Sequence, residues 1–165
     1  KDDNNLFIGT TGNTAREMYS FMPDTNNFYM AGNMGGALSI GLGAAKGGKK
    51  VFICGGDAEF VMHMGGLTTA GRYSEEIDLT YILFDNESNK STGGQDTYQG
   101  HVNYIGIAKN SNFMPHGNTI TNLDQFSELL KSFNAYKGTK FVHVKCDYDE
   151  ETPRPPIESV KVNSF

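Results

Sequence analysis

The feature that most constrains the fold is segment 55–60, Gly-Gly-Asp-Ala-Glu-Phe, together with the two patterns that flank it. Residues 50–54 form a short apolar run rich in β-branched and aromatic side chains, which is typical of a buried strand. Residues 58–71 carry apolar side chains in helical order. Asp57 therefore stands where a strand passes into a helix. In open α/β sheets ligands bind at this edge, and helix amino termini offer free N–H groups to phosphate there.

A second buried-strand pattern, residues 79–84, ends directly on Asp85 and Asn86. Two neighbouring parallel strands would bring Asp57 and Asn86 to the same edge of the sheet. A carboxylate, an amide oxygen and a main-chain carbonyl are the hard oxygen ligands that suit Mg²⁺ or Ca²⁺, and they leave positions open for phosphate oxygens. The sequence therefore predicts a metal-bound diphosphate. The structural alternative is that Asp57 caps a helix and Asn86 serves a turn.

These two segments resemble the Gly-Asp-Gly and Asn motif of thiamine diphosphate-dependent enzymes. The run Met-His-Met-Gly at 62–65 is similar to that of phosphonopyruvate and sulfopyruvate decarboxylases. Further segments resemble this family in the correct order, so that the resemblance extends roughly over residues 6–156. They are Gly-Thr-Thr-Gly at 9–12, Arg-Glu-Met-Tyr at 16–19, Ala-Gly-Asn-Met-Gly at 31–35, Gly-Gly-Gln at 93–95 and Gly-Ile-Ala-Lys at 106–109.

The resemblance implies that thiamine diphosphate and Mg²⁺ are the cofactors, and it assigns roles to individual residues. Asp57, Asn86 and the Ser88 carbonyl would bind the metal. The Gly32 carbonyl would accept a hydrogen bond from the aminopyrimidine, and Met34 would hold the cofactor in its bent form. The complete set of implied cofactor-binding residues is Thr11, Gly12, Gly32, Met34, Gly56, Asp57, Ala58, Glu59, Asn86 and Ser88.

Three departures from the family pattern bear on the site. Ala58 replaces a usual glycine, which is tolerable if the backbone there is right-handed, because the main-chain N–H groups of residues 58 and 59 remain available to diphosphate. Asp85 replaces an asparagine, and its added negative charge calls for a nearby cation. Asn89 and Lys90 stand where the related decarboxylases carry His and Asp. Lys90 could contact an anionic substrate, and the alternative is an ordinary solvent-facing lysine. His63 is expected on the motif helix as a packed or partly exposed side chain, and the alternative is that it approaches the cofactor's phosphates or a subunit interface.

Alternation of strand and helix patterns predicts a doubly wound parallel α/β sheet with helices on both faces, in a single domain over residues 1–165. Strands are expected at 6–8, 28–30, 50–54, 79–84 and 139–146, and helices at 14–21, 37–45, 58–71, 102–109 and 122–136. The inward side chains are expected to be Ala15, Met18 and Tyr19 on the first helix, and Leu123, Phe126, Leu129, Leu130 and Phe133 on the last. Residues 147–156 read as an extended tail.

Composition narrows the functional classes. A formal net charge of −5 argues against nucleic acid or an anionic membrane as a partner. Cys54 and Cys146 are expected to be reduced in a cytoplasmic protein, and no apolar run is long enough to span a membrane.

In the family the glutamate that activates the cofactor belongs to a pyrimidine-binding domain, and nothing in this chain corresponds to it. The resemblance thus implies half of an oligomeric enzyme, homo- or hetero-oligomeric, whose partner is a pyrimidine-binding domain or subunit. The implied reaction is decarboxylation of a small anionic 2-oxo acid, first phosphonopyruvate to phosphonoacetaldehyde and CO₂, and second sulfopyruvate as a beta-type subunit. An acetolactate-synthase-like carboligase and a non-catalytic, flavodoxin-like phosphate-binding module are the alternatives.

Overall fold

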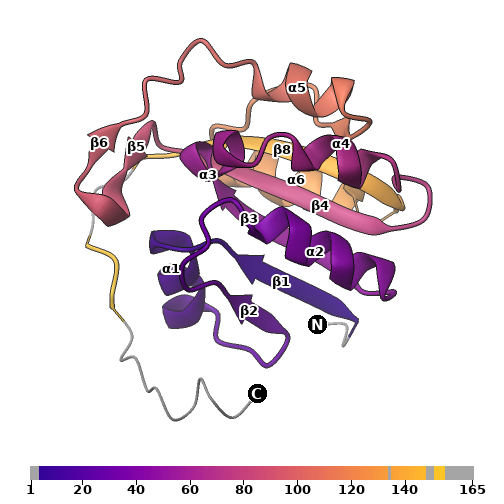
Figure 1. Ribbon diagram of the computed structural model, residues 1–165, viewed down its shortest axis with the longest axis horizontal. Helices are drawn as coiled ribbons and strands as arrows, with labels where there is room; N and C mark the ends of the chain where they lie inside the picture. The colour runs from indigo at the N-terminus through magenta and orange to yellow at the C-terminus, as the bar shows by residue number, and fades with distance from the viewer. Residues whose placement is uncertain (1–3, 134, 148–150, 155–165) are drawn as a thin grey trace.

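A six-stranded, fully parallel sheet in the order β2-β1-β3-β4-β8-β7 forms the centre of the computed structural model, which describes residues 4–133, 135–147 and 151–154. The predicted α/β class is confirmed, and helices cover both faces (Figure 1). The strands are β1 (Asn5–Gly9), β2 (Asn27–Tyr29), β3 (Lys50–Gly56), β4 (Asp78–Asp85), β7 (Met114–Pro115) and β8 (Gly138–Lys145). Of these, β7 has no counterpart among the predicted strands.

The helices fall on the two faces of the sheet as right-handed crossovers require. Helices α2 (Ala37–Lys46), α4 (Gly66–Gly71) and α5 (Tyr104–Asn110) share one core with β1, β3, β4 and β8, and they lie in front of the sheet in Figure 1. Helix α6 (Leu123–Phe133) lies behind it and packs on Ile82 and Val142 through Leu129 and Phe133. Helix α1 (Asn13–Phe21) buries Ala15 and Met18 beside β1 and β2.

The chain reverses its direction across the sheet between β1 and β3. From β1 it passes through α1 to β2 on one side, then returns through α2 to β3 on the other side of β1. The carboxyl ends of β1 and β3 therefore flank a topological switch point, which is where open α/β sheets bind ligands. The turn after β1 holds Thr10 and Thr11, and β3 runs directly into Asp57.

The predicted single helix over residues 58–71 is wrong, because the structure breaks it into α3 (Asp57–Met62) and α4. His63 leaves the helical conformation with φ −126° and ψ 31°, and the Gly66 N–H then donates to the His63 carbonyl at 2.9 Å. Gly65 and Gly66 follow the break, and glycine lowers the stability of a helix interior. A Cβ on Gly66 would also lie 2.4 Å from the His63 ring.

Two further predictions of inward side chains are wrong. Tyr19 is 46% exposed and makes only an edge contact with the ring of Tyr29. Leu123 is 83% exposed because it opens α6, before the helix reaches the sheet, whereas Leu129 and Phe133 are buried. Asn122 does cap this helix, since its side chain accepts the Gln125 N–H at 3.0 Å. Within the predicted tail 147–156, residues 148–150 and 155–156 lie outside the described residues, as does residue 134 within the predicted last helix.

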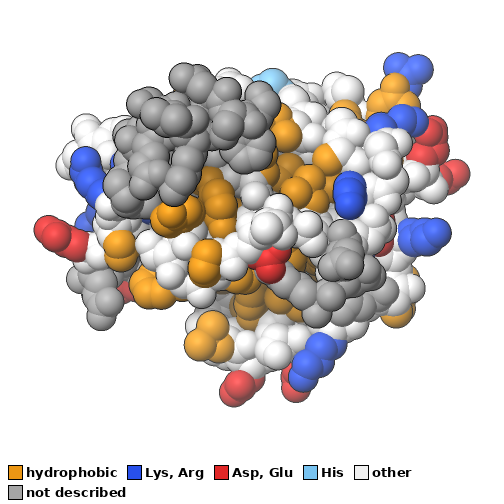
Figure 2. Space-filling view, turned by 90° about the horizontal axis from the view of Figure 1, so that it is seen from below, with side chains coloured by type: hydrophobic (Ala, Val, Ile, Leu, Met, Phe, Trp, Pro, Cys, Tyr) orange, Lys and Arg blue, Asp and Glu red, His pale blue; other side chains and the backbone are white. Residues whose placement is uncertain are grey.

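The edge of the molecule formed by α1 and β2 carries exposed apolar side chains, and Figure 2 views it from below. Phe21 and Phe28 are exposed, with Tyr19 and Met22 beside them. In the described ranges, no helix has the length and apolar character needed to cross a membrane.

Candidate functional site

A cavity of about 350 Å³ opens at the switch point, along the carboxyl ends of β1, β3 and β4. Its walls come from the turn after β1, the start of α3, the loop after β4 and the segment that follows β8. The lining residues are Thr10, Thr11, Asn13, Thr14, Glu17, Met34, Gly56, Asp57, Ala58, Glu59, Phe84, Asn86, Ser88, Asn89, Lys90, Ser91, Cys146 and Asp147. Eight of the ten predicted cofactor residues thus lie on one cavity, and Gly12 and Gly32 lie outside its lining.

Asp57 is the first residue of α3 and is almost completely buried. Its Oδ2 accepts a hydrogen bond from Thr97 Oγ1 at 2.9 Å. Burial raises the pKa of this carboxyl, although the Thr97 hydrogen bond partly opposes the shift. A buried carboxylate at the amino terminus of a helix, facing a polar cavity, is suited to bind a cation.

Asn86 and Ser88 follow β4, which pairs in parallel with β3, so both residues reach the cavity beside Asp57. Asn86 Oδ1 accepts the Ser88 N–H at 3.1 Å, and Asn86 is therefore also a turn residue. An amide oxygen has two lone pairs, so this hydrogen bond leaves one for a second partner. The predicted convergence of Asp57, Asn86 and Ser88 at one sheet edge agrees with the cavity lining.

The turn after β1 and the segment before α2 are joined by one hydrogen bond. The Gly32 N–H donates to Thr11 Oγ1 at 3.0 Å. Gly12 has φ 98°, and a Cβ at this position would lie 2.8 Å from Ser91 Oγ, so a side chain is excluded by both conformation and space. Met34, which follows Gly32 in this segment, also lines the cavity.

Glu59 lies beneath the cavity, and its carboxyl group points into the protein. It is 3% exposed, and its Oε2 accepts from the hydroxyl of buried Tyr81 at 3.3 Å. Burial raises the pKa of this carboxyl, while Thr10, Tyr81 and main-chain N–H groups lower it. Thr10 lies close enough to affect this pKa, yet its Oγ1 makes no hydrogen bond of normal geometry. Ala58 is helical, so the alanine is accommodated in a right-handed backbone as predicted.

Asp85 has the nearby cation that its position calls for. Its Oδ2 accepts from Lys145 Nζ at 3.2 Å and from His143 Nε2 at 3.0 Å. Burial alone would raise the pKa of Asp85, but the hydrogen bonds from His143 and Lys145 outweigh it and hold this pKa below its usual value. Neither partner is adjacent to Asp85 in sequence. The parallel pairing of β4 with β8 brings them together.

Residues 88–96, which follow the candidate metal ligands, form a small antiparallel hairpin of β5 (Ser88–Asn89) and β6 (Gln95–Asp96), joined through the 3-10 turn Lys90–Thr92. Figure 1 shows this hairpin standing beyond the carboxyl ends of the strands. Lys90 and Ser91 line the cavity, and Thr97 ties the hairpin back to Asp57. This hairpin therefore borders the cavity, and its Ser91 comes close to Gly12 in the turn after β1.

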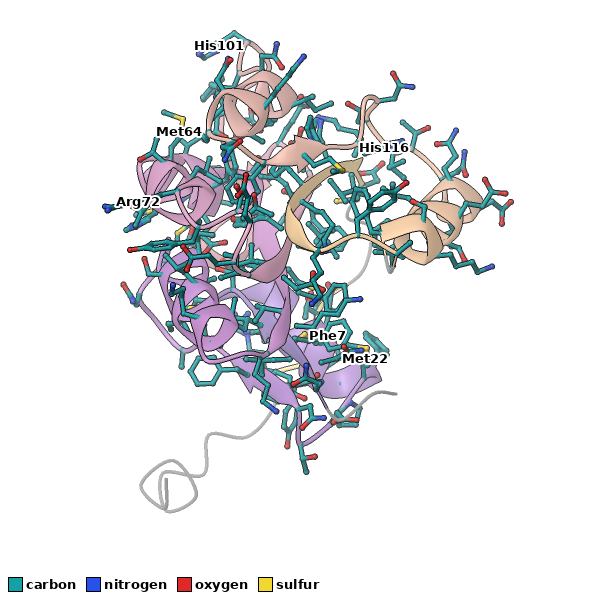
Figure 3. All side chains as sticks on the ribbon, turned by 90° about the vertical axis from the view of Figure 1, so that its right-hand side faces the viewer. Phe7, Met22, Met64, Arg72, His101 and His116 are labelled. Atoms are coloured by element: carbon teal, nitrogen blue, oxygen red, sulfur yellow. The ribbon has the colours of Figure 1, made fainter. Side chains whose placement is uncertain are left out.

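The histidines do not converge on one site. His63 sits at the break between α3 and α4, where its Nε2 lies 3.3 Å from Ser39 Oγ, and neighbouring Met64 is partly exposed. His101 and His116 lie in separate parts of the molecule (Figure 3). Among the described residues, no group of three or more His, Cys, Asp and Glu side chains is placed to hold a metal. A metal here would need Asn86 and main-chain oxygen.

The cavity fits a metal-bound diphosphate in two respects. Ser88 Oγ, a buried hydroxyl oxygen on its wall, has no hydrogen-bond partner among the described residues, and Thr10 Oγ1 has none of normal geometry there although it lies near Glu59, so both can accept or donate to a polar ligand. Of the described side chains that line it, Glu17, Asp57 and Asp147 are acidic, Glu59 turns its carboxyl group into the protein, and Lys90 is the one lysine. An anionic ligand would be repelled by such a wall unless a divalent cation accompanied it.

Fold and cavity together define a class: doubly wound α/β domains with a polar ligand cavity at the switch point. Residues 8–151 match the family model described as thiamine pyrophosphate enzyme, C-terminal TPP binding domain. The chain belongs to this family.

Three known proteins illustrate the relationship. The phosphonopyruvate decarboxylase of Streptomyces viridochromogenes is 33% identical over 138 residues, which cover 83% of this chain and 34% of that protein. The sulfopyruvate decarboxylase subunit beta of Methanothermobacter thermautotrophicus is 34% identical over 143 residues, 86% of this chain and 74% of that subunit. The structure of benzoylformate decarboxylase from Polynucleobacter necessarius superposes with a TM-score of 0.72 at 16% identity, over 93% of this chain and 32% of that one. The chain thus spans about a third of the first relative and about three quarters of the second.

Proposed function

We propose that this chain is the diphosphate- and Mg²⁺-binding half of a thiamine diphosphate-dependent 2-oxo acid decarboxylase. The observation that carries the proposal is the convergence of Asp57, Asn86 and Ser88 on one acidic cavity at the switch point. Family membership and the two decarboxylase relatives support it.

In this proposal the metal is held by the Asp57 carboxylate, Asn86 Oδ1 and the Ser88 carbonyl. The main-chain N–H groups of Ala58 and Glu59, in the first turn of α3, and the hydroxyl group of Thr10 would bind the diphosphate. Gly12 and Gly32 do not line the cavity and would act by shaping its wall, Gly12 through its left-handed backbone and Gly32 through its N–H bond to Thr11. Once bound, thiamine diphosphate serves as the electron sink for loss of CO₂ from the substrate.

The activating glutamate would come from a pyrimidine-binding domain, on a second subunit or elsewhere in a longer polypeptide. The matched region is only 34% of the Streptomyces enzyme, whereas the methanogen relative is a beta subunit. Both arrangements agree with a chain that supplies one of two domain types. The isolated chain is therefore expected to bind cofactor without turning over substrate.

For the substrate we propose phosphonopyruvate, which would yield phosphonoacetaldehyde and CO₂. Lys90 on the cavity wall would face the anionic end of the substrate. Sulfopyruvate is the second candidate, and it is favoured by the greater share of the sulfopyruvate decarboxylase beta subunit that the chain spans. Both substrates carry an anionic group that a lysine can bind.

Isothermal titration of the chain with thiamine diphosphate, with and without Mg²⁺, tests the cofactor proposal. We expect binding that requires Mg²⁺ and is lost in Asp57→Ala. The control Asp124→Ala, which changes an exposed carboxylate in the first turn of α6, should bind as the native chain does. Magnesium-independent binding that survives Asp57→Ala would instead indicate a simple phosphate-binding module. With a pyrimidine-binding partner added, aldehyde release from phosphonopyruvate and from sulfopyruvate identifies the substrate.

A further inference from the structure

The loop proposed to bind the metal, residues 85–88, rests on a group of side chains that we call the Asp85 cluster: Asp85, His143, Lys145 and Thr119. His143 Nε2 lies 3.0 Å and Lys145 Nζ 3.2 Å from Asp85 Oδ2. On the far side of the same ring, His143 Nδ1 lies 2.9 Å from Thr119 Oγ1. The cluster thus connects Thr119, which precedes α6, through side chains of β8 to Asp85 at the start of the metal loop, residues 85–88.

The other Asp85 oxygen shapes the metal loop directly. Asp85 Oδ1 accepts the Glu87 N–H at 3.1 Å, and one residue later Asn86 Oδ1 accepts the Ser88 N–H at the same distance. Glu87 adopts φ 55°, a conformation that non-glycine residues adopt only where surrounding contacts impose it. Lys145 Nζ also contacts Glu87 Oε1 at 2.7 Å. Two successive side-chain turns and one left-handed residue therefore place Asn86 and Ser88.

His143 fixes the Asp85 carboxylate in the orientation that these turns need. A carboxylate only accepts, so Nε2 donates to Asp85 and, in the neutral ring, Nδ1 accepts the Thr119 hydroxyl. Tyr104 packs against the ring, with centroids 5.1 Å apart, and restricts its rotation. Asp85 is buried, so its carboxylate depends on these partners rather than on water.

We propose that the Asp85 cluster holds the metal loop in its ligand-binding conformation before any ligand arrives. His143, Asp85 and Lys145 are then positioning residues that act on the metal through Asn86 and Ser88. This inference rests on the proposed function for the identity of the metal. The effect of the cluster on the conformation of the loop does not depend on that identity.

The test compares His143→Phe, which keeps a ring against Tyr104 but has no donor for Asp85, with the native chain in two measurements. The first is amide hydrogen exchange of Glu87 and Ser88 without ligand, which we expect to accelerate by about tenfold or more as the turns loosen. The second is the Mg²⁺ affinity measured in the presence of thiamine diphosphate, which we expect to weaken by about 10- to 100-fold, as for other residues that orient metal ligands. Glu76→Gln, which breaks the exposed Lys46–Glu76 ion pair, is the matched control and should change neither.

Thr119→Val provides a milder variant if His143→Phe does not fold, because it removes only the hydroxyl that contacts Nδ1. The same two changes are expected in the same direction, with smaller size. A folded variant in which both amides exchange at the native rate and Mg²⁺ affinity is unchanged would overturn the proposal. Failure of the native chain to bind thiamine diphosphate with Mg²⁺ would instead overturn the proposed function, while the exchange measurement would still decide whether the cluster orders the loop.

Discussion

Replacing Tyr81 with phenylalanine removes a single buried hydrogen bond beneath the cavity. The Tyr81 hydroxyl donates to Glu59 Oε2 at 3.3 Å, and both side chains are buried. The ring of Tyr81 packs against Phe60 and Phe141, with centroid distances of 5.7 and 6.0 Å, and phenylalanine would preserve these contacts. The substitution therefore isolates the hydroxyl group.

The size of the effect follows from the charge on Glu59. Hydrogen bonds to charged groups contribute about 1.5–3 kcal/mol, and the length of this one places it near the lower end, about 1.5 kcal/mol. For a chain of this size, such a loss lowers the melting temperature by roughly 3–6 °C.

The effect should depend on pH in a defined direction. Burial raises the pKa of Glu59 above its unfolded value, so the ionised carboxyl lowers the stability of the fold at neutral pH. Protonation relieves this cost as pH falls through the raised pKa. Since the Tyr81 hydroxyl mainly stabilises the charged form, the loss in Tyr81→Phe should be greatest above the raised pKa of Glu59 and should shrink as the pH falls through it.

Urea denaturation at neutral and mildly acidic pH measures both quantities. Tyr98→Phe is the control, because Tyr98 is 81% exposed and should change the free energy of unfolding by less than about 0.5 kcal/mol. Equal stability of Tyr81→Phe and the native chain at pH 7, or a loss that grows toward acid, would refute this account of Glu59.

Three more changes test other parts of the structure. Burial raises the pKa of Asp57, so the charge of this carboxylate lowers the stability of the fold. Asp57→Asn should therefore leave the melting temperature of the ligand-free chain unchanged or higher, while titration with thiamine diphosphate and Mg²⁺ shows no binding. A lower melting temperature would contradict this. A Cβ on Gly71 would lie 1.8 Å from the Ser111 carbonyl oxygen, so Gly71→Ala should lower the free energy of unfolding by about 3 kcal/mol or more. The control Gly43→Ala lies in open space on α2 and should raise the free energy of unfolding by up to about 1 kcal/mol in the same denaturation assay. Burial raises the pKa of Cys54 to about 12 and that of Cys146 to about 11. Iodoacetamide at pH 8 should therefore modify both thiols only after denaturation, which mass spectrometry would show. Rapid labelling of the folded chain would argue against such burial.

The sheet and the approach of Asp57 to Asn86 follow from local sequence, because strands 50–54 and 79–84 are strongly apolar and polar residues follow soon after each of them. Parallel pairing then determines that both residues reach one edge. The roles of Met34, Ser88 and Ala58 came instead from the resemblance to the family's motifs, and the structure places all three on the cavity wall.

The helix break at His63 and the partners of Asp85 could not be obtained in this way. The apolar pattern of 58–71 continues across Gly65 and Gly66, and the break depends on where the His63 ring packs in the folded protein. The contact of Asp85 with His143 joins residues 58 positions apart, and the alternation of His143 with apolar neighbours indicated only a strand. Leu123 satisfied the helical period but lies in the first turn, beyond the contact with the sheet.

Both edge strands of the sheet, β2 and β7, are short. At one side β2 pairs over only three residues, and at the other β7 pairs over two, one of which is Pro115, a residue with no N–H group to donate. Such short edge strands present few free main-chain N–H and C=O groups to a strand from another chain, and this limits aggregation by edge-to-edge strand pairing. Assembly into a working enzyme is therefore expected to proceed through helices and loops rather than by extending the sheet.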